Sequence, residues 1–202
     1  GDSLGWFEEL YAIAGDDTSL IPWPDLPQRL DLVDWLDQNN IINSGLALKV
    51  GCGLGDDAEE LARRGFKTTA FDISKSAIDI SRKRFPGSPV SYVDADLFST
   101  PTDWQYKFDF VLESYTLQVL PPDLRANAIE YIADFVAPGG TLLVIARARE
   151  PEESKGNLPW PLTKEELSLF RLYKLQEISF EDYIDTEDPP VRRFRVTYSK
   201  LK

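Results

Sequence analysis

The sequence of 202 residues contains no histidine, no methionine and only one cysteine, Cys52. Histidine is the side chain that titrates nearest neutral pH, and it is the commonest metal ligand. Its absence excludes serine–histidine triads, histidine zinc sites and histidine phosphorelays. A single cysteine excludes an internal disulfide and a cysteine cluster, so we expect no metal site and a reducing, cytoplasmic location.

Basic residues and long apolar runs are also scarce. The chain has 22 Lys and Arg residues against 34 Asp and Glu residues, a formal net charge of −12, which repels phosphate backbones and anionic lipids. No run approaches the roughly 18 apolar residues that span a bilayer. The N-terminal "GDSLGWFEEL" lacks the basic segment followed by an apolar segment that a secretory signal has. We expect a soluble monomer or homodimer that acts on a small molecule, with no nucleic-acid or membrane partner.

Apolar, β-branched runs alternate with helical patterns through the middle of the chain, which is typical of βαβ units and a parallel sheet. The last of these helices should end at the Pro-Gly-Gly turn of residues 138–140. The expected strands are 46–50, 67–71, 89–93, 108–112 and 141–146, and the expected helices are 56–65, 75–85 and 122–137.

The alternation of strands and helices is not continued at the two ends of the chain. Two helices, 3–14 and 26–40, should precede the first strand. After residue 150, "TKEE" from Thr163 reads as a helix capping box, and strands 176–183 and 191–199 should pair as an antiparallel hairpin. The whole pattern predicts an α/β fold with a mostly parallel, seven-stranded sheet and an antiparallel C-terminal hairpin.

A glycine loop follows the first predicted strand in "ALKVGCGLGDDAEELARRG", residues 47–65. Loops of this kind let a backbone approach a ligand closely. A triphosphate loop needs a lysine and a hydroxyl residue after its last glycine, and a dinucleotide loop has the spacing GxGxxG. Here Asp56 and Asp57 follow the glycines; they satisfy the helix N-terminus, by about 0.3–1 kcal/mol each, and oppose a pyrophosphate. The loop predicts a neutral or cationic ligand, or else an ordinary tight turn.

Two aspartates follow the next strands. Asp72 ends the second strand, 21 residues after Gly51, where a carboxylate can accept hydrogen bonds from both hydroxyls of a ribose. Asp96 comes just after the third strand. Because the carboxyl ends of parallel strands meet at one edge of a sheet, we expect both to lie near the glycine loop. The alternative for each aspartate is a helix cap or a solvated turn.

The stretches "VGCGLG" and "AFDIS" resemble the class I methyltransferases that use S-adenosylmethionine, and the resemblance covers roughly residues 45–150. It implies a three-layer α/β/α Rossmann-like sandwich, with S-adenosyl-L-methionine as cofactor and S-adenosyl-L-homocysteine as product. Asp72 would then bind the ribose, and Asp96 the adenine amino group. The implied cofactor-binding residues are Gly51, Cys52, Gly53, Gly55, Asp72, Ile73, Asp96, Leu97, Glu113 and Trp23. One departure is Lys49, where the family often has an acid.

The N-terminal "GWFEEL" and "LIPWPD" resemble the thiopurine, thiol and halide methyltransferase group, in which such segments cover the cofactor. The length of 202 residues and the 43% hydrophobic content predict one domain over residues 1–202. Within it we expect a helical cap at 1–44, which this resemblance implies, a cofactor-binding core at 45–150 and a C-terminal helix and hairpin at 151–202. Trp6, Tyr11 and Trp23 would form a lid that excludes water. The alternative is a hydrophobic staple that holds the leading helices on the sheet.

Methyl transfer from a sulfonium is a displacement with an activated leaving group, so alignment can supply about 7–11 kcal/mol and histidine is dispensable. This favours an acceptor that is easily deprotonated, such as a thiol, or one served by a carboxylate or tyrosine. Glu113 and Tyr115, after the fourth strand, are the candidate catalytic residues. The alternatives are a structural role for Glu113 and a pocket wall for Tyr115.

Two arginines follow the fifth strand. Arg147 and Arg149 could bind an anionic substrate, or they could pair with the carboxylates of Glu150, Glu152 and Glu153. Two other functions stay open: a cofactor-binding regulatory module without chemistry, and a nicotinamide-dependent oxidoreductase. Asp56 and Asp57 disfavour the oxidoreductase because it requires a free helix N-terminus.

Overall fold

The computed structural model describes residues 4–15, 17–20, 26–42 and 45–202. The chain divides into two compact units, Gly1–Pro101 and Thr102–Lys202, each of which has its own set of strands. Trp23, which was predicted to bind the cofactor, lies outside the described residues. The single domain with its cap, core and C-terminal part stays a prediction.

The first unit contains three parallel strands in the order β3-β2-β1. Their pairing runs from Leu46 opposite Lys67 to Asp72 opposite Asp94. The strands are β1 (Leu46–Val50), β2 (Lys67–Asp72) and β3 (Ser91–Asp94), and the helices are α1 (Gly5–Ala14), η1 (Thr18–Leu20), α2 (Leu26–Gln38), α3 (Asp56–Arg63), α4 (Lys75–Arg84) and η2 (Leu97–Ser99).

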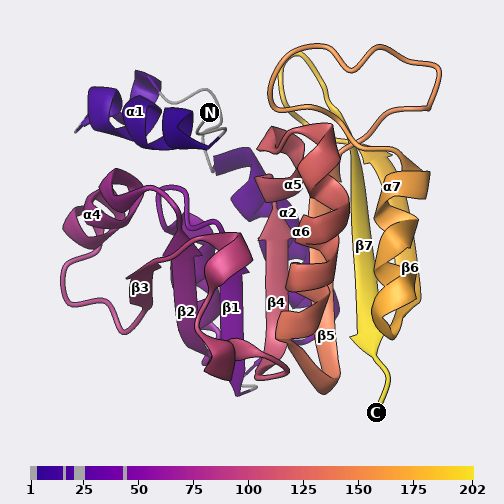
Figure 1. Ribbon diagram of the computed structural model, residues 1–202, viewed down its shortest axis with the longest axis horizontal. Coiled ribbons are helices and arrows are strands. Elements are labelled where there is room, and N and C mark those ends of the chain that lie inside the picture. The colour runs from indigo at the N-terminus through magenta and orange to yellow at the C-terminus, as the bar shows by residue number, and fades with distance from the viewer. Residues whose placement is uncertain (1–3, 16, 21–25, 43–44) are drawn as a thin grey trace. The chain divides into compact units, whose positions relative to one another are not determined.

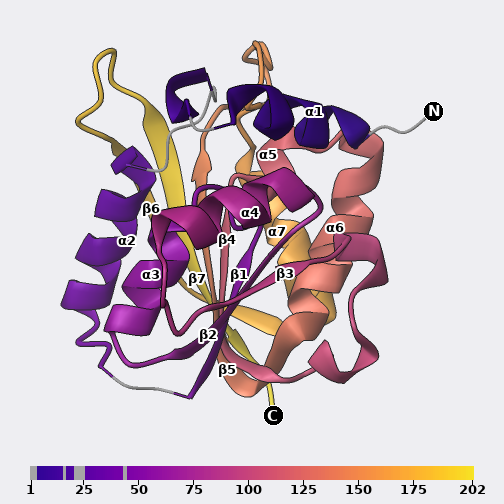
Figure 2. The same cartoon turned by 90° about the vertical axis from the view of Figure 1, so that its left-hand side faces the viewer.

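Local chemistry explains why these elements form where they do. In β1, Ala47, Leu48 and Val50 are fully buried, as expected for a parallel strand covered on both faces. Helix α4 starts at its N-cap Ser74, whose hydroxyl accepts a hydrogen bond from the backbone N–H of Ala77 at 3.1 Å. Helix α1 lies over α4, as Figure 2 shows.

The second unit contains four strands in the order β4-β5-β7-β6 (Figure 1). β4 and β5 are parallel, whereas β7 is antiparallel to both of its neighbours. Helices α6 and α7 lie on one face of this part of the sheet. The strands are β4 (Phe108–Ser114), β5 (Val136–Arg147), β6 (Leu175–Ile184) and β7 (Arg192–Lys200), and the helices are η3 (Thr102–Trp104), α5 (Thr116–Val119), α6 (Pro122–Phe135), α7 (Lys164–Ser168) and η4 (Leu169–Tyr173).

The predicted fold class is confirmed: the seven-stranded sheet is mostly parallel and ends in an antiparallel C-terminal hairpin. The capping box at Thr163 is also confirmed, because its hydroxyl accepts from the N–H of Glu166 and the Glu166 carboxylate accepts from the N–H of Thr163. Across the hairpin, Arg195 pairs with Glu181, which lies directly opposite it, at 2.7 Å.

The start of the fifth strand was predicted wrongly. β5 begins at Val136, so residues 136–140 belong to a strand instead of a helix end and turn. Val136 pairs with Phe108 before the register shifts. At Gly140, a Cβ atom would lie 2.9–3.1 Å from the carbonyl oxygens of Ala137, Phe108 and Asp109, so the close approach of the two strands requires glycine.

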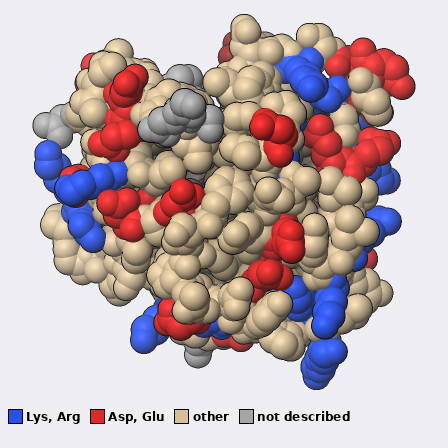
Figure 3. Space-filling view, viewed as in Figure 1, with Lys and Arg blue, Asp and Glu red and all other residues tan. Residues whose placement is uncertain are grey.

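Among the described residues, no helix is long and apolar enough to cross a bilayer, and no group of three His, Cys, Asp or Glu side chains is arranged to hold a metal ion. On the face shown in Figure 3, acidic and basic side chains are interspersed. The prediction that nucleic acid is not a partner stays a prediction.

Candidate functional site

The glycine loop connects β1 to α3 through three left-handed backbone conformations. Gly51, Gly53 and Gly55 have φ angles of 67°, 53° and 92°, which residues with a side chain rarely adopt. The N–H of Gly55 donates to the carbonyl oxygen of Cys52 at 2.9 Å and closes the turn. The loop is therefore a tight turn whose backbone depends on glycine at each of these positions.

The acidic residues after the loop are held by neighbouring elements. The Asp56 carboxylate pairs with Arg84 of α4 at 2.8 Å, and Arg84 also donates to the carbonyl oxygen of Leu54. Glu59 accepts hydrogen bonds from the hydroxyls of Tyr92 at 2.7 Å and Ser88 at 2.6 Å. The first turn of α3 thus holds carboxylates at fixed positions, of which Asp56 is paired with a guanidinium and Glu59 is held by hydroxyls; carboxylates at a helix N-terminus disfavour a pyrophosphate there.

Asp72 lies against the glycine loop, as the sequence predicts. Its Oδ2 accepts from the N–H of Gly53 at 3.4 Å, and its Oδ1 accepts from the N–H of Ser74 at 3.0 Å. Burial raises the pKa of the Asp72 carboxyl above its usual value, although these N–H groups and the charge of Lys49 act in the opposite direction. The structure therefore brings a carboxylate and the glycine backbone together at the end of β2.

The segment after β3 reaches the same edge. The carbonyl oxygen of Asp72 accepts from the N–H of Ala95 at 3.0 Å, which ties this segment to the end of β2. The carboxylate of Asp96 caps η2 by accepting from the N–H of Phe98 at 2.9 Å. This is the helix-cap role that sequence reasoning kept as the alternative, so a contact of Asp96 with adenine stays a prediction. Leu97 is buried and Ile73 is 36% exposed.

Lys49 and Cys52 serve the loop itself. The buried Lys49 ammonium donates to the carbonyl oxygens of Val50 and Gly51, both at 2.8 Å, so the side chain points to the loop and not away from it. The Cys52 sulfur lies 3.4 Å from the carbonyl oxygen of Gly53 and is buried. This is the position expected of a small apolar side chain that fills space in the core.

Sequence reasoning missed Glu8 of α1. Its carboxylate accepts from the hydroxyls of Ser74 and Ser76, both at 2.6 Å, and from the N–H of Ser76 at 3.1 Å. Burial acts to raise the pKa of Glu8, but these donors outweigh it and lower the pKa overall. Helix α1 is thus attached to the N-terminus of α4, next to Asp72. The sequence offered only the pair of serines as a signal, because Glu8 lies 66 residues before Ser74.

The N-terminal aromatic side chains give a mixed result. Tyr11 is 3% exposed and Phe7 is buried, as expected for side chains that hold α1 on the fold. Trp6 stacks on Phe7 with ring centroids 3.9 Å apart. Since Trp23 is outside the described residues, the aromatic lid stays a prediction.

In the second unit, both candidate catalytic residues lie at the end of β4. Glu113 is 1% exposed, and its Oε1 accepts from the N–H of Leu117 at 3.1 Å, which is the structural role that was kept as the alternative. Tyr115 begins α5 in a left-handed conformation, with φ of 77°, and is buried. Its hydroxyl accepts a hydrogen bond from Arg193 at 3.3 Å.

Arg193 is a second residue that sequence reasoning missed. Its fully buried guanidinium pairs with Asp185 at 2.5 Å and Glu187 at 2.8 Å, and the carbon of the guanidinium lies 5.9 Å from the centre of the Tyr115 ring. Burial acts to lower the pKa of Arg193, but Tyr115 and Asp185 raise it overall. Arg193 lies in the stretch "RRFR" at residues 192–195, and strand alternation turns it to the opposite face from Arg192.

Gln118 is a buried polar residue next to these groups. Its Oε1 accepts from the N–H of Arg147 at 3.2 Å, and its backbone carbonyl accepts from the N–H of Trp160 at 2.8 Å. Within the described part of the chain, Gln118 Nε2 and Arg147 Nε are buried and have no hydrogen-bond partner. Both nitrogen atoms are donors, so each is a buried polar atom whose acceptor is missing from the described residues.

Arg149 does not pair with the carboxylates that were expected. Its guanidinium donates to the backbone carbonyl oxygens of Glu150, Pro151 and Glu153, and lies 3.8 Å from the Glu166 carboxylate. The chain turns around Arg149 in this way because a buried guanidinium carries five donors that must be satisfied.

Comparison with known proteins finds relatives of the middle part of the chain. Residues 47–140 match the methyltransferase domain family. The probable thiol methyltransferase 2 of Arabidopsis thaliana is 28% identical over 130 residues, which are 61% of this chain and 55% of that protein. The chain spans about half to three fifths of the length of the curated relatives it matches.

Solved structures share the fold at low sequence identity. A 1,6-didemethyltoxoflavin N1-methyltransferase of Burkholderia thailandensis, with bound S-adenosylhomocysteine, has a TM-score of 0.77 at 16% identity and covers 98% of this chain and 88% of its own. The N-methyltransferase NodS of Bradyrhizobium japonicum, also with S-adenosylhomocysteine, has a TM-score of 0.75 at 18% identity, with both chains fully covered. Residues 47–140, slightly less than half of the chain, thus match the methyltransferase domain family, and the resemblance to class I S-adenosylmethionine-dependent methyltransferases is confirmed.

Proposed function

We propose that this chain is an S-adenosylmethionine-dependent methyltransferase with a small-molecule acceptor. The observation that carries the proposal is the contact between the Asp72 carboxylate and the N–H of Gly53 at the carboxyl ends of parallel strands. The family match and the solved structures with bound S-adenosylhomocysteine support the same cofactor.

The charges around the loop fit this cofactor better than a dinucleotide. The acids in the first turn of α3 oppose a pyrophosphate, while a ligand without phosphates meets no such repulsion. In this proposal Asp72 accepts hydrogen bonds from the ribose hydroxyls and Ile73 packs on the adenine. When bound, S-adenosylmethionine supplies a methyl group activated by the sulfonium.

We further propose a thiol, or another nucleophile that is easily deprotonated, as the acceptor. A thiol has an unperturbed pKa near 8.5, so a fraction is already thiolate at neutral pH and a histidine base is not needed. The similarity to a probable thiol methyltransferase supports this class. Tyr115, held by Arg193, and the donor Gln118 Nε2 would orient the acceptor.

Calorimetric titration tests the cofactor. S-adenosylmethionine and S-adenosylhomocysteine should bind, and Asp72→Asn should weaken both about ten- to a hundredfold, because hydrogen bonds to a charged group contribute about 1.5–3 kcal/mol. Asp79→Asn, a surface acid paired with Lys75 on α4, is the matched control and should bind normally. The proposal is contradicted if Asp72→Asn binds S-adenosylmethionine as tightly as the unmodified chain does, or if the protein binds NAD and not S-adenosylmethionine.

A mass-spectrometric screen tests the chemistry. The protein with S-adenosylmethionine is incubated with thiols, phenols, amines and carboxylates. On the thiols a methyl group should replace the proton, so their mass should increase by one CH₂ unit. Cofactor binding without any methylated product would favour the regulatory module instead.

A further inference from the structure

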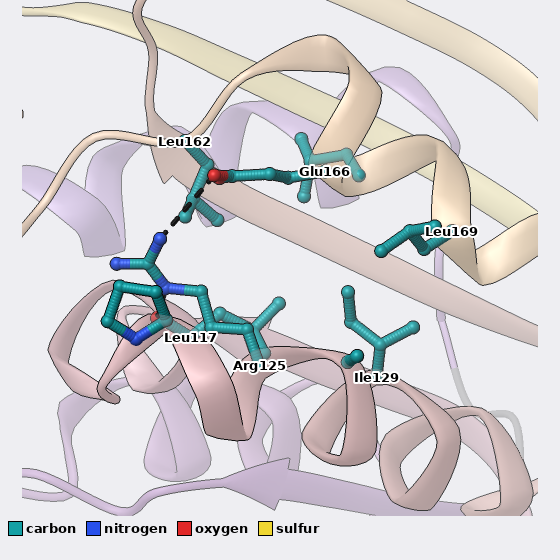
Figure 4. Close-up of a pocket in the computed structure, with 9 residues that line it drawn as sticks. Leu117, Arg125, Ile129, Leu162, Glu166 and Leu169 are labelled. Atoms are coloured by element: carbon teal, nitrogen blue, oxygen red, sulfur yellow. Dashed lines mark hydrogen bonds and ion pairs between the residues drawn. The ribbon is translucent and has the colours of Figure 1, made fainter.

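The second unit contains a cavity of about 120 Å³ between α5, α6 and α7 (Figure 4). Aliphatic side chains line most of it, and Arg125 and Glu166 are its charged residues. Figure 4 shows the Arg125 guanidinium and the Glu166 carboxylate facing each other at one end, with Ile129 and Leu169 at the other. The predicted cofactor-binding and catalytic residues do not line this cavity.

The Arg125 guanidinium is buried but incompletely paired. It is 6% exposed, and its Nε donates to the carbonyl oxygen of Leu117 at 3.1 Å. Its Nη1 lies 3.5 Å from Glu166 Oε1, longer than the usual 2.7–2.9 Å of a charge-assisted hydrogen bond. Its Nη2 is buried without a hydrogen-bond partner in the part of the chain that the structure describes.

The charges at this end of the cavity do not balance. Arg149 is also buried, and its Nη2 lies 3.8 Å from the same Glu166 oxygen. Two guanidinium groups therefore share one carboxylate, which leaves one positive charge in excess. Burial lowers the pKa of Arg125, as expected for a cation without full compensation. Nη1 of Arg149 donates to three backbone carbonyl groups and its Nε to that of Pro161, whereas Nη2 of Arg125 has no hydrogen-bond partner among the described residues.

We propose that this cavity binds a short aliphatic monocarboxylate, with the carboxylate on Arg125 Nη2 and the chain among Leu117, Ile129 and Leu169. A carboxylate matches a guanidinium in charge and geometry, and the aliphatic lining favours an anion that carries a hydrocarbon chain. An engineered apolar cavity of about 150 Å³ admits benzene, so a cavity of this size admits an acid of about three or four carbons.

Butyrate is the probe, and butyramide is its neutral isostere. Calorimetry should show saturable butyrate binding with a dissociation constant on the order of 1 mM, the range expected for so few atoms. Butyramide should bind at least tenfold more weakly. Butyrate should also change the fluorescence of Trp160, because the Arg125 guanidinium lies 5.5 Å from its ring centre.

Two variants and one control locate the site. Arg125→Gln should weaken butyrate at least tenfold, and Leu169→Phe should do the same by filling the cavity while Arg125 is kept. Arg171→Gln removes an exposed arginine paired with Glu177 and should bind like the unmodified chain. If Arg125→Gln fails to fold, the affinity of Leu169→Phe for butyrate still tests whether the ligand occupies this cavity. Equal binding of butyrate and butyramide, unaltered binding by Leu169→Phe, or a crystal structure at 50 mM butyrate with only water on Nη2 would overturn the proposal.

Discussion

Replacing Gly55 by alanine should destabilise the chain more than the same change at another glycine with positive φ. Gly55 has φ of +92°, and an added Cβ would lie 2.7 Å from the Tyr92 hydroxyl oxygen. Gly87 has φ of +75° and no atom within 4 Å of an added Cβ. Both changes incur the cost of a left-handed alanine, about 1–2 kcal/mol. Gly55→Ala adds an overlap cost of about 1–3 kcal/mol.

The overlap should not relax easily, because the Tyr92 hydroxyl is held by Glu59 at 2.7 Å. Urea unfolding of the two variants should therefore give free energies of unfolding that differ by about 1–3 kcal/mol. Adding Tyr92→Phe to Gly55→Ala removes the overlapping oxygen and should recover part of the loss, which a double-mutant cycle measures. Equal free energies for Gly55→Ala and Gly87→Ala, or no coupling to Tyr92→Phe, would refute this reasoning.

Three other predictions concern charged and hydroxyl groups. Because the pKa of Glu8 is lowered in the folded chain, its stabilisation of α1 should be complete above about pH 4.3 and lost as the pH falls through the folded value; amide exchange in α1 should show this loss, and Glu8→Gln should abolish it. Arg193→Gln should reduce the free energy of unfolding by about 3–5 kcal/mol and Arg192→Gln, an exposed pair, by about 0–1 kcal/mol; similar values for both in urea would contradict the buried pairing. Tyr115→Phe should lower kcat while calorimetry shows unchanged cofactor affinity, and a kcat equal to that of the unmodified chain would remove Tyr115 from the reaction.

Short sequence patterns correctly predicted the features that depend on residues close together in the chain or on the general geometry of a parallel sheet. β1 was predicted at its observed bounds because its apolar run lies between Gly45 and Gly51. Thr163 was identified because a capping box lies within four consecutive residues. Asp72 could be placed beside the glycine loop because parallel strands end at a common edge.

The features that were missed depend on distant partners. The start of β5 at Val136 requires pairing with Phe108, and the four residues of α5 are too few for a helix that is stable by itself. The role of Glu8 appears only when α1 meets α4, and that of Arg193 only when β7 places it beside Tyr115. No pattern within a window of sequence contains these pairs.

The backbone N–H and carbonyl groups of Leu117 are hydrogen-bonded to two different buried side chains, a glutamate and an arginine. Glu113 accepts from its N–H at 3.1 Å, and Arg125 donates to its carbonyl oxygen at 3.1 Å. Amide chemical shifts respond to both kinds of hydrogen bond, so one backbone resonance can report on two places in the chain. With ¹⁵N-labelled protein, the Leu117 signal would serve as a built-in spectroscopic probe, read in a single spectrum, of the Arg125 contact where we propose butyrate to bind and of the Glu113 contact at the end of β4.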